Sequence, residues 1–160
     1  MIDETGLKIL TILQDKARIP NVEVARQVGM APSAVLERIR KFEKQGIIDG
    51  YEVRLNPKRF NRSLMAFIYV QADMKADQTK VGQALSKIPE VQEVHFVAGV
   101  DGYLIKVRVA DTSDLKDFLE KKILTIQSVH SVRTNIVLTT LKETSRIPLE
   151  DKHSAFMDSN

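Results

Sequence analysis

Two helix-forming stretches early in the chain are joined by a very short turn. The first predicted helix spans Val22–Val28, with Asn21 as its N-cap. Gly29 follows, and glycine adopts the left-handed conformation beyond a helix C-terminus at little cost. Pro32 suits the first turn of the second helix, predicted over Pro32–Lys44, since a proline there breaks no hydrogen bond. The pattern predicts two helices that meet at a tight turn.

The second helix divides into an apolar and a polar face. Val35, Ile39 and Phe42 recur at helical spacing and are expected to pack inward. The outward positions are Ser33, Ala34, Glu37 and Lys41, with Arg38, Arg40 and Lys44 on the flanks. Such a face is also typical of an ordinary amphipathic helix with solvated charges. Small residues at the helix start would permit close approach to base edges, and the cations could reach phosphates or guanine.

The neighbouring segments favour the interpretation that this face contacts nucleic acid. A helix is predicted over Asp3–Lys16, with Asp3 or Thr5 near its N-cap and an apolar side formed by Ile9, Leu10, Ile12 and Leu13. After the second helix, Ile47–Leu55 alternates loosely, as a strand would, and carries Arg54. Helix, turn, helix and strand in this order indicate a winged helix-turn-helix, which places one helix in the major groove of DNA.

Composition excludes several classes of protein. The chain has 160 residues, of which 43% are hydrophobic, enough for one domain or two small ones. No apolar run approaches the roughly 18 residues that span a membrane, and the acidic start differs from a signal peptide. Cysteine is absent, which excludes disulfides and thiolate sites, and His95, His130 and His153 show no ligand spacing. We expect a soluble cytoplasmic protein without metal or cofactor.

Positive charge is concentrated in the first part of the chain. Residues 1–60 hold 11 Lys and Arg against 8 Asp and Glu, whereas residues 61–160 hold 13 of each. The surplus therefore lies on the segment predicted to bind nucleic acid. Because three charges attract DNA weakly, an oligomer that multiplies the contacts is favoured.

The second part of the chain alternates strands and helices. A polar, basic linker at 56–62 precedes it, and a tail with a docking segment at Ile147–Leu149 follows it. The predicted strands are Leu64–Ala72, Val91–Val97, Tyr103–Ala110 and Val129–Leu141, and the predicted helices are Thr79–Lys87 and Asp114–Lys122, the latter capped by Thr112. The order βαββαβ predicts a ferredoxin-like antiparallel sheet with two helices on one face. The expected fold is α+β, with domains at 1–55 and 63–142 and a tail at 143–160.

Several stretches together resemble the Lrp/AsnC family, the leucine-responsive and asparagine-responsive regulators of bacteria and archaea. The matching stretches are Asp3–Leu10, Arg38–Glu43, Gly46–Tyr51, Val97–Gly99, Tyr103–Val109, Thr134–Leu138 and Ile147–Leu149. The resemblance implies a sequence-specific transcription regulator that binds an imperfect palindrome in double-stranded DNA. It also implies a homodimer that assembles into a larger oligomer, such as an octamer.

The resemblance further implies a small effector, commonly an amino acid, bound between subunits at the turn between the second and third strands. The corresponding residues are Ala98, Gly99, Val100, Asp101, Gly102, Tyr103 and Thr134. Asp101 could accept hydrogen bonds from an α-amino group if the loop turns it inward. A plain hairpin turn is an equal alternative for this loop.

The role of Glu37 and the function of the whole chain each allow more than one interpretation. Glu37 could accept from cytosine N4 or pair with Lys41 one turn later, and the intrahelical pair is favoured. An enzyme resembling tetrapyrrole decarboxylases is a second candidate for the function, although the scattered histidines favour a structural or interface role for His95. The third candidate is an effector-binding module that does not bind DNA.

Overall fold

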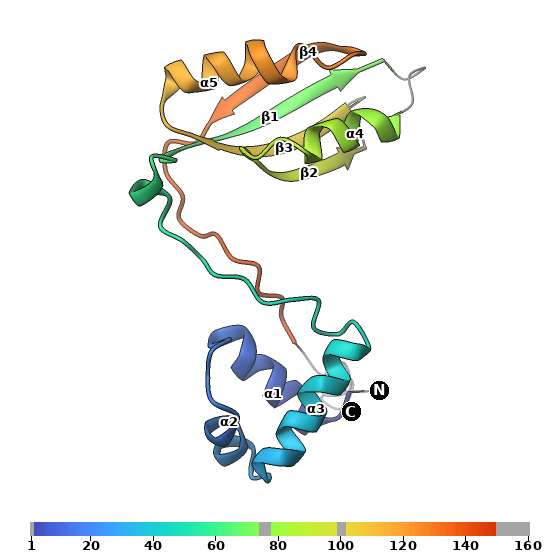
Figure 1. Ribbon diagram of the computed structural model, residues 1–160, viewed down its shortest axis with the longest axis vertical. Coiled ribbons are helices and arrows are strands. Elements are labelled where there is room, and N and C mark those ends of the chain that lie inside the picture. The colour runs from blue at the N-terminus through green and yellow to red at the C-terminus, as the bar shows by residue number, and fades with distance from the viewer. Residues whose placement is uncertain (1, 74–77, 99–101, 150–160) are drawn as a thin grey trace, which may run out of the picture. The chain divides into compact units, whose positions relative to one another are not determined.

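The computed structural model describes residues 2–73, 78–98 and 102–149 and is shown in Figure 1. Contacts divide the chain into two units. The helical unit comprises the described residues up to Val53 together with those from Glu143 onward, and the sheet unit comprises Arg54–Lys142. The domains expected from the sequence differ in placing residues 54 and 55 with the helices and in separating the tail.

The helical unit contains α1 (Glu4–Asp15), α2 (Asn21–Val28) and α3 (Pro32–Lys44). The Asp3 Oδ1 atom caps α1 by accepting from the Gly6 N–H at 2.9 Å. Asn21 was expected to cap α2, and this is wrong. The carbonyl of Pro20 accepts from the Glu23 and Val24 N–H groups, so that Pro20 is the N-cap and α2 starts one residue earlier.

The three helices bury one apolar core. Its buried residues are Ile9, Leu10, Leu13, Val24, Ala25, Val35, Ile39 and Phe42. Ile12, which was expected to be buried, is only half-buried at the edge of this core. Gly29 ends α2 with φ +68°, the left-handed conformation that the short turn requires. The predicted packing face of α3 is confirmed.

The predicted strand at Ile47–Leu55 is wrong: residues 47–56 form no strand in the structure. A strand requires a neighbouring strand that pairs with its backbone N–H and C=O groups, and none of the described strands pairs with this segment. Its apolar side chains are not buried either, since Val53 is 81% exposed. The expected linker instead contains a short 3₁₀ helix, η1 (Pro57–Phe60), which Asn56 caps by accepting from the Lys58 N–H at 3.1 Å.

The sheet unit has the predicted element order. Its elements are β1 (Leu64–Ala72), α4 (Gln78–Ser86), β2 (Val91–Val97), β3 (Gly102–Val109), α5 (Thr112–Phe118) with the π-helical turn η2 (Leu119–Ile123), and β4 (Val129–Ile136). The strands pair antiparallel in the order β2-β3-β1-β4 (Figure 1). The ferredoxin-like βαββαβ fold is confirmed.

Several element ends in this unit differ from the sequence expectation, and the clearest differences are at α5 and β4. Asp111, not Thr112, caps α5, because its Oδ1 accepts from the Asp114 N–H at 2.9 Å. The last strand ends at Ile136, which pairs with Ala66 of β1, instead of at Leu141; beyond it the Val137 N–H still donates to the Met65 carbonyl at 2.9 Å. Leu141, beyond that pairing, is 95% exposed.

The sheet has one covered and one open face. Ile68 and Ile105 lie opposite each other on the covered face and share a core with Val81 of α4 and Phe118 of α5. Because side chains alternate along a strand, Phe67, Tyr69 and Leu104 point the other way, and all three are only half-buried. We call this second surface, formed by residues such as Phe67, Tyr69 and Leu104, the open face.

Candidate nucleic-acid interface and effector site

The outward side of α3 is accessible along its whole length. Val35, Ile39 and Phe42 hold the helix on the core. The residues predicted to face outward are exposed, with the exceptions of Ala34 and Arg38, which are half-buried; the exposed ones are Ser33, Glu37, Arg40, Lys41 and Lys44. A cationic helix surface of this kind can contact phosphates and base edges.

Arg38 has a partner that the sequence did not reveal. Its Nη1 atom lies 2.6 Å from the Asp3 Oδ1 atom, the same oxygen that caps α1. This hydrogen bond, donated by Arg38, lowers the pKa of Asp3 and raises the pKa of Arg38. Arg38 therefore fastens α3 to the start of α1. No local pattern could indicate a pair 35 residues apart.

Glu37 and Lys41 do not form the expected intrahelical pair, so that expectation is wrong; within the described residues neither side chain makes an ion pair. Exposed pairs at this spacing contribute only about 0.3–0.5 kcal/mol, so solvent competes well. A pair of the same spacing does form on α1, between Lys8 and Glu4 at 2.6 Å. Both Glu37 and Lys41 are thus available to an external partner.

Two other polar residues frame the helical unit. Tyr51 donates to the Glu43 Oε1 atom at 2.9 Å, which ties the chain beyond α3 to the helix. Burial and this hydrogen bond raise the pKa of Tyr51 to about 12. Arg54, which was expected to join the DNA-binding residues, belongs to the sheet unit, so the surface described here rests on α3.

The effector residues predicted from the family resemblance fall partly outside the described residues. Gly99, Val100 and Asp101 lie there, and nothing follows about them. Of the others, Ala98 comes directly after β2, and Gly102 pairs with Val97 at the start of β3. The structure therefore groups Ala98 and Gly102 at one end of the sheet.

Tyr103 and Thr134 occupy separate places on the covered face. Tyr103 is buried, and its ring lies so close to Gly82 of α4 that a Cβ atom there would be 3.0 Å from the ring. Thr134 lies opposite Ile68, on the far side of β1 from β3. The structure does not bring these two side chains together within one subunit.

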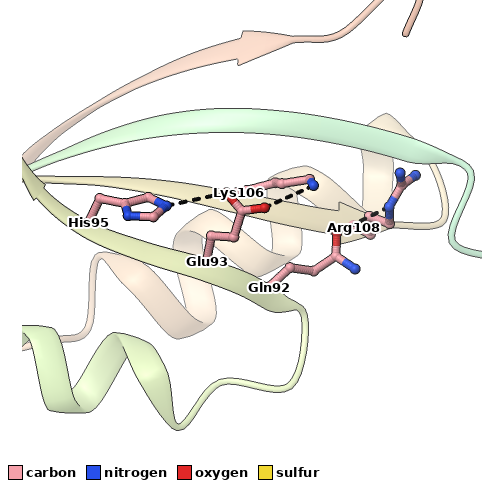
Figure 2. Close-up of polar contacts among 5 residues, drawn as sticks. All are labelled: Gln92, Glu93, His95, Lys106 and Arg108. Atoms are coloured by element: carbon pink, nitrogen blue, oxygen red, sulfur yellow. Dashed lines mark hydrogen bonds and ion pairs between the residues drawn. The ribbon is translucent and has the colours of Figure 1, made fainter. Parts of the chain in front are cut away.

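The open face carries a polar network that no sequence motif indicated (Figure 2). Lys106 Nζ lies 3.0 Å from Glu93 Oε1, and His95 Nε2 lies 3.2 Å from Glu93 Oε2. Burial opposes ionisation of Glu93, but the bonds from Lys106 and His95 outweigh it and lower the pKa of this carboxyl group. Arg108 donates to Gln92 nearby at 3.1 Å. The sequence signal that could have indicated this network is the alternation of Lys106 and Arg108 with the buried valines of β3.

Two further observations bear on the class of site. Across residues 2–73, 78–98 and 102–149, no three histidine, aspartate or glutamate side chains gather as ligands of a metal ion. In that same part of the chain, no helix has both the length and the apolar composition to cross a bilayer.

Comparison with known proteins places these features in a wider group. The family model described as the Lrp/AsnC ligand binding domain matches residues 64–147, and a winged helix-turn-helix DNA-binding model matches residues 2–49. The leucine-responsive regulatory proteins of Escherichia coli (strain K12) and Klebsiella pneumoniae are each 35% identical over 153 residues, which cover 94% of this chain and 93% of theirs.

Two solved structures are similar over nearly the whole chain. A transcriptional regulator from Neisseria meningitidis, in complex with L-methionine, has a TM-score of 0.89 and 30% identity, and the match covers 96% of this chain and 99% of that one. The AsnC protein of E. coli has a TM-score of 0.85 and 29% identity, and the match covers 92% of this chain and 99% of that one.

Proposed function

This chain belongs to the Lrp/AsnC family of DNA-binding transcription regulators, and we propose that α3 reads its operator while the sheet unit binds an amino acid. Because its relatives are regulators with a DNA-binding domain, neither the enzyme alternative nor a module without DNA binding is supported. We place its action in the cytoplasm, since the function requires access to DNA.

The observation that carries the proposal is the exposed side of α3. Ser33, Glu37 and Lys41 follow one another along this side without partners among the described residues. The small residue leads, which permits close approach of the helix start to the bases. Lys41 is the base-reading candidate and Glu37 a candidate acceptor for cytosine N4. Arg38, Arg40 and Lys44 flank this row as candidates for phosphate contacts, and we keep Arg54 as an outlying one.

We assign effector binding to the end of the sheet where Ala98 and Gly102 lie, together with Gly99, Val100, Asp101, Tyr103 and Thr134. The regulator from N. meningitidis was solved with L-methionine, which supports an amino acid as the ligand class. Tyr103 and Thr134 are held apart by β1 in one subunit. A site completed by a second subunit accounts for both assignments.

We propose a homodimer that joins its subunits through the open face and builds into a larger assembly, such as an octamer. Half-buried apolar side chains on an uncovered sheet surface favour association with a second copy. The network of Glu93, His95 and Lys106 borders these side chains and would supply polar contacts at the rim.

Selection of binding sites from random double-stranded DNA tests the proposal. The parent protein should recover an imperfect palindrome whose half-sites lie about one helical turn apart, or a multiple of that distance. Lys41→Ala should relax the preference at one position in each half-site, because a base contact contributes roughly 1–3 kcal/mol of discrimination. Repeating the binding with each amino acid should reveal one that changes the affinity.

Lys8→Ala is the matched control, because Lys8 is an exposed lysine on α1 whose removal should leave the motif unchanged. An unchanged motif for Lys41→Ala would remove this residue from base reading. If the parent recovered no motif at all, sequence-specific binding would be refuted.

A further inference from the structure

The end of α1 binds the backbone of the C-terminal segment. The side-chain amide of Gln14 donates from Nε2 to the Ile147 carbonyl at 3.1 Å and accepts from the Ile147 N–H at Oε1 at 2.9 Å. A primary amide offers one donor and one acceptor side by side, as a neighbouring β-strand does. Gln14 therefore holds Ile147 at both of its backbone groups, whatever side chain stands there.

Arg146, before Ile147, and Leu149, after it, extend this attachment. The Arg146 Nη1 atom lies 2.9 Å from the Asp15 Oδ1 atom, and its Nη2 atom lies 3.4 Å from the Asp15 carbonyl. Leu149 is half-buried against the core of the helical unit. The attachment thus combines backbone recognition, an ion pair and an apolar anchor, and we call these contacts the tail clamp.

The tail clamp changes how the two units are connected. The sheet unit, Arg54–Lys142, is inserted between two segments that both belong to the helical unit. One connection follows Val53, and the other runs from the end of β4 at Ile136 to Glu143 and the clamp. A unit held by two chain connections has less freedom than a unit held by one.

We propose that this surface of α1 is a receptor for residues Arg146–Leu149, and that the docked segment restrains the DNA-binding unit so that an oligomer can engage two half-sites together. The inference rests on the proposed function. Once one helical unit has bound its half-site, a restrained second unit reaches the other half-site at a higher effective concentration. Binding to a single half-site gains nothing from this restraint.

The contacts are individually weak because they are exposed, which makes the clamp removable without loss of the fold. Gln14→Ala combined with Arg146→Ala removes the hydrogen bonds and the ion pair and leaves every helix-core residue in place. A chain that stops after Lys142 removes the whole segment. The control for this truncation stops after Leu149, and the control for the double substitution is Lys8→Ala on the same helix.

The test compares DNA carrying two selected half-sites with DNA carrying one. We expect the double variant and the chain ending at Lys142 to bind the two-site DNA about tenfold more weakly, with single-site affinity changed less than about twofold. Amide hydrogen exchange at the end of α1 should accelerate in the same two proteins. Both controls should match the parent.

Unchanged two-site affinity in the double variant, or an equal loss on both DNAs, would overturn the inference. If the truncated chain does not fold, the two-site and single-site affinities of the double variant still test the inference. A parent that binds neither DNA would contradict the proposed function, whereas hydrogen exchange at α1 would still show whether the segment docks. Unchanged exchange in the double variant would then refute the receptor itself.

Discussion

At the scale of single residues, Asp3 performs two tasks with one oxygen atom. Its Oδ1 atom caps α1 through Gly6 and pairs with Arg38 of α3. Both bonds favour the carboxylate form, and the pKa of Asp3 is lowered, with the bond from Arg38 as the largest cause. A depressed pKa stabilises the fold above the unfolded-state pKa, about 3.9 for Asp, and this contribution is lost as the pH falls through the folded-state pKa.

We therefore predict that Asp3→Asn flattens the acid end of the stability curve of the helical unit. Asparagine keeps an acceptor for the Gly6 N–H but cannot titrate or pair as an anion with Arg38. Helical circular dichroism should show that the unfolding temperature falls less between pH 5 and pH 3, about two units spanning the Asp range, in Asp3→Asn than in the parent. Asp49→Asn, at another exposed carboxylate in this unit, is the control. Parallel curves for Asp3→Asn and the parent would show that the pair does not contribute.

At the scale of elements, the pairing of β1 with β3 requires a glycine at its end. A Cβ atom on Gly102 would collide with the Val70 carbonyl oxygen, which belongs to the backbone of β1 and cannot rotate away. Gly102 thus permits the close approach of the two strands beside the proposed effector site.

Gly102→Ala should consequently destabilise the sheet unit by about 1–3 kcal/mol or more, as forced overpacking does. Urea unfolding followed by far-ultraviolet circular dichroism measures the effect. Gly50→Ala is the matched control, since a Cβ atom there meets nothing within 4 Å. The same unfolding midpoint in both variants would mean that the strands separate without cost.

At the scale of the whole molecule, the open face decides the assembly that we propose. Leu104→Arg introduces a charge among Phe67 and Tyr69, and a buried unpaired charge strongly opposes association. Light scattering at micromolar concentration should show a smaller assembly for Leu104→Arg than for the parent. Leu124→Arg, at an exposed leucine of the same unit, should leave the mass unchanged. A stable monomeric parent would refute the assembly, and an unaltered mass for Leu104→Arg would exclude this face.

The sequence by itself determined those elements that local patterns define. Pro32–Lys44, Leu64–Ala72 and Val91–Val97 have the same bounds in the structure as in the prediction. Apolar periodicity identifies the side that a helix or strand buries, and proline and glycine mark where it begins and ends. These signals lie within the element, so that no knowledge of the rest of the fold is needed. The order of the elements then indicated both the helix-turn-helix and the βαββαβ sheet.

Only the tertiary structure decided features that depend on a distant partner. The segment at Ile47–Leu55 has a strand-like pattern but no strand to pair with, and β4 stops where its pairing with β1 stops. The partner of Arg38 and the attachment of Ile147 to Gln14 likewise join residues far apart in the chain. Hydrogen bonds and ion pairs form wherever folding brings two groups together, and one sequence records the groups without recording which of them meet.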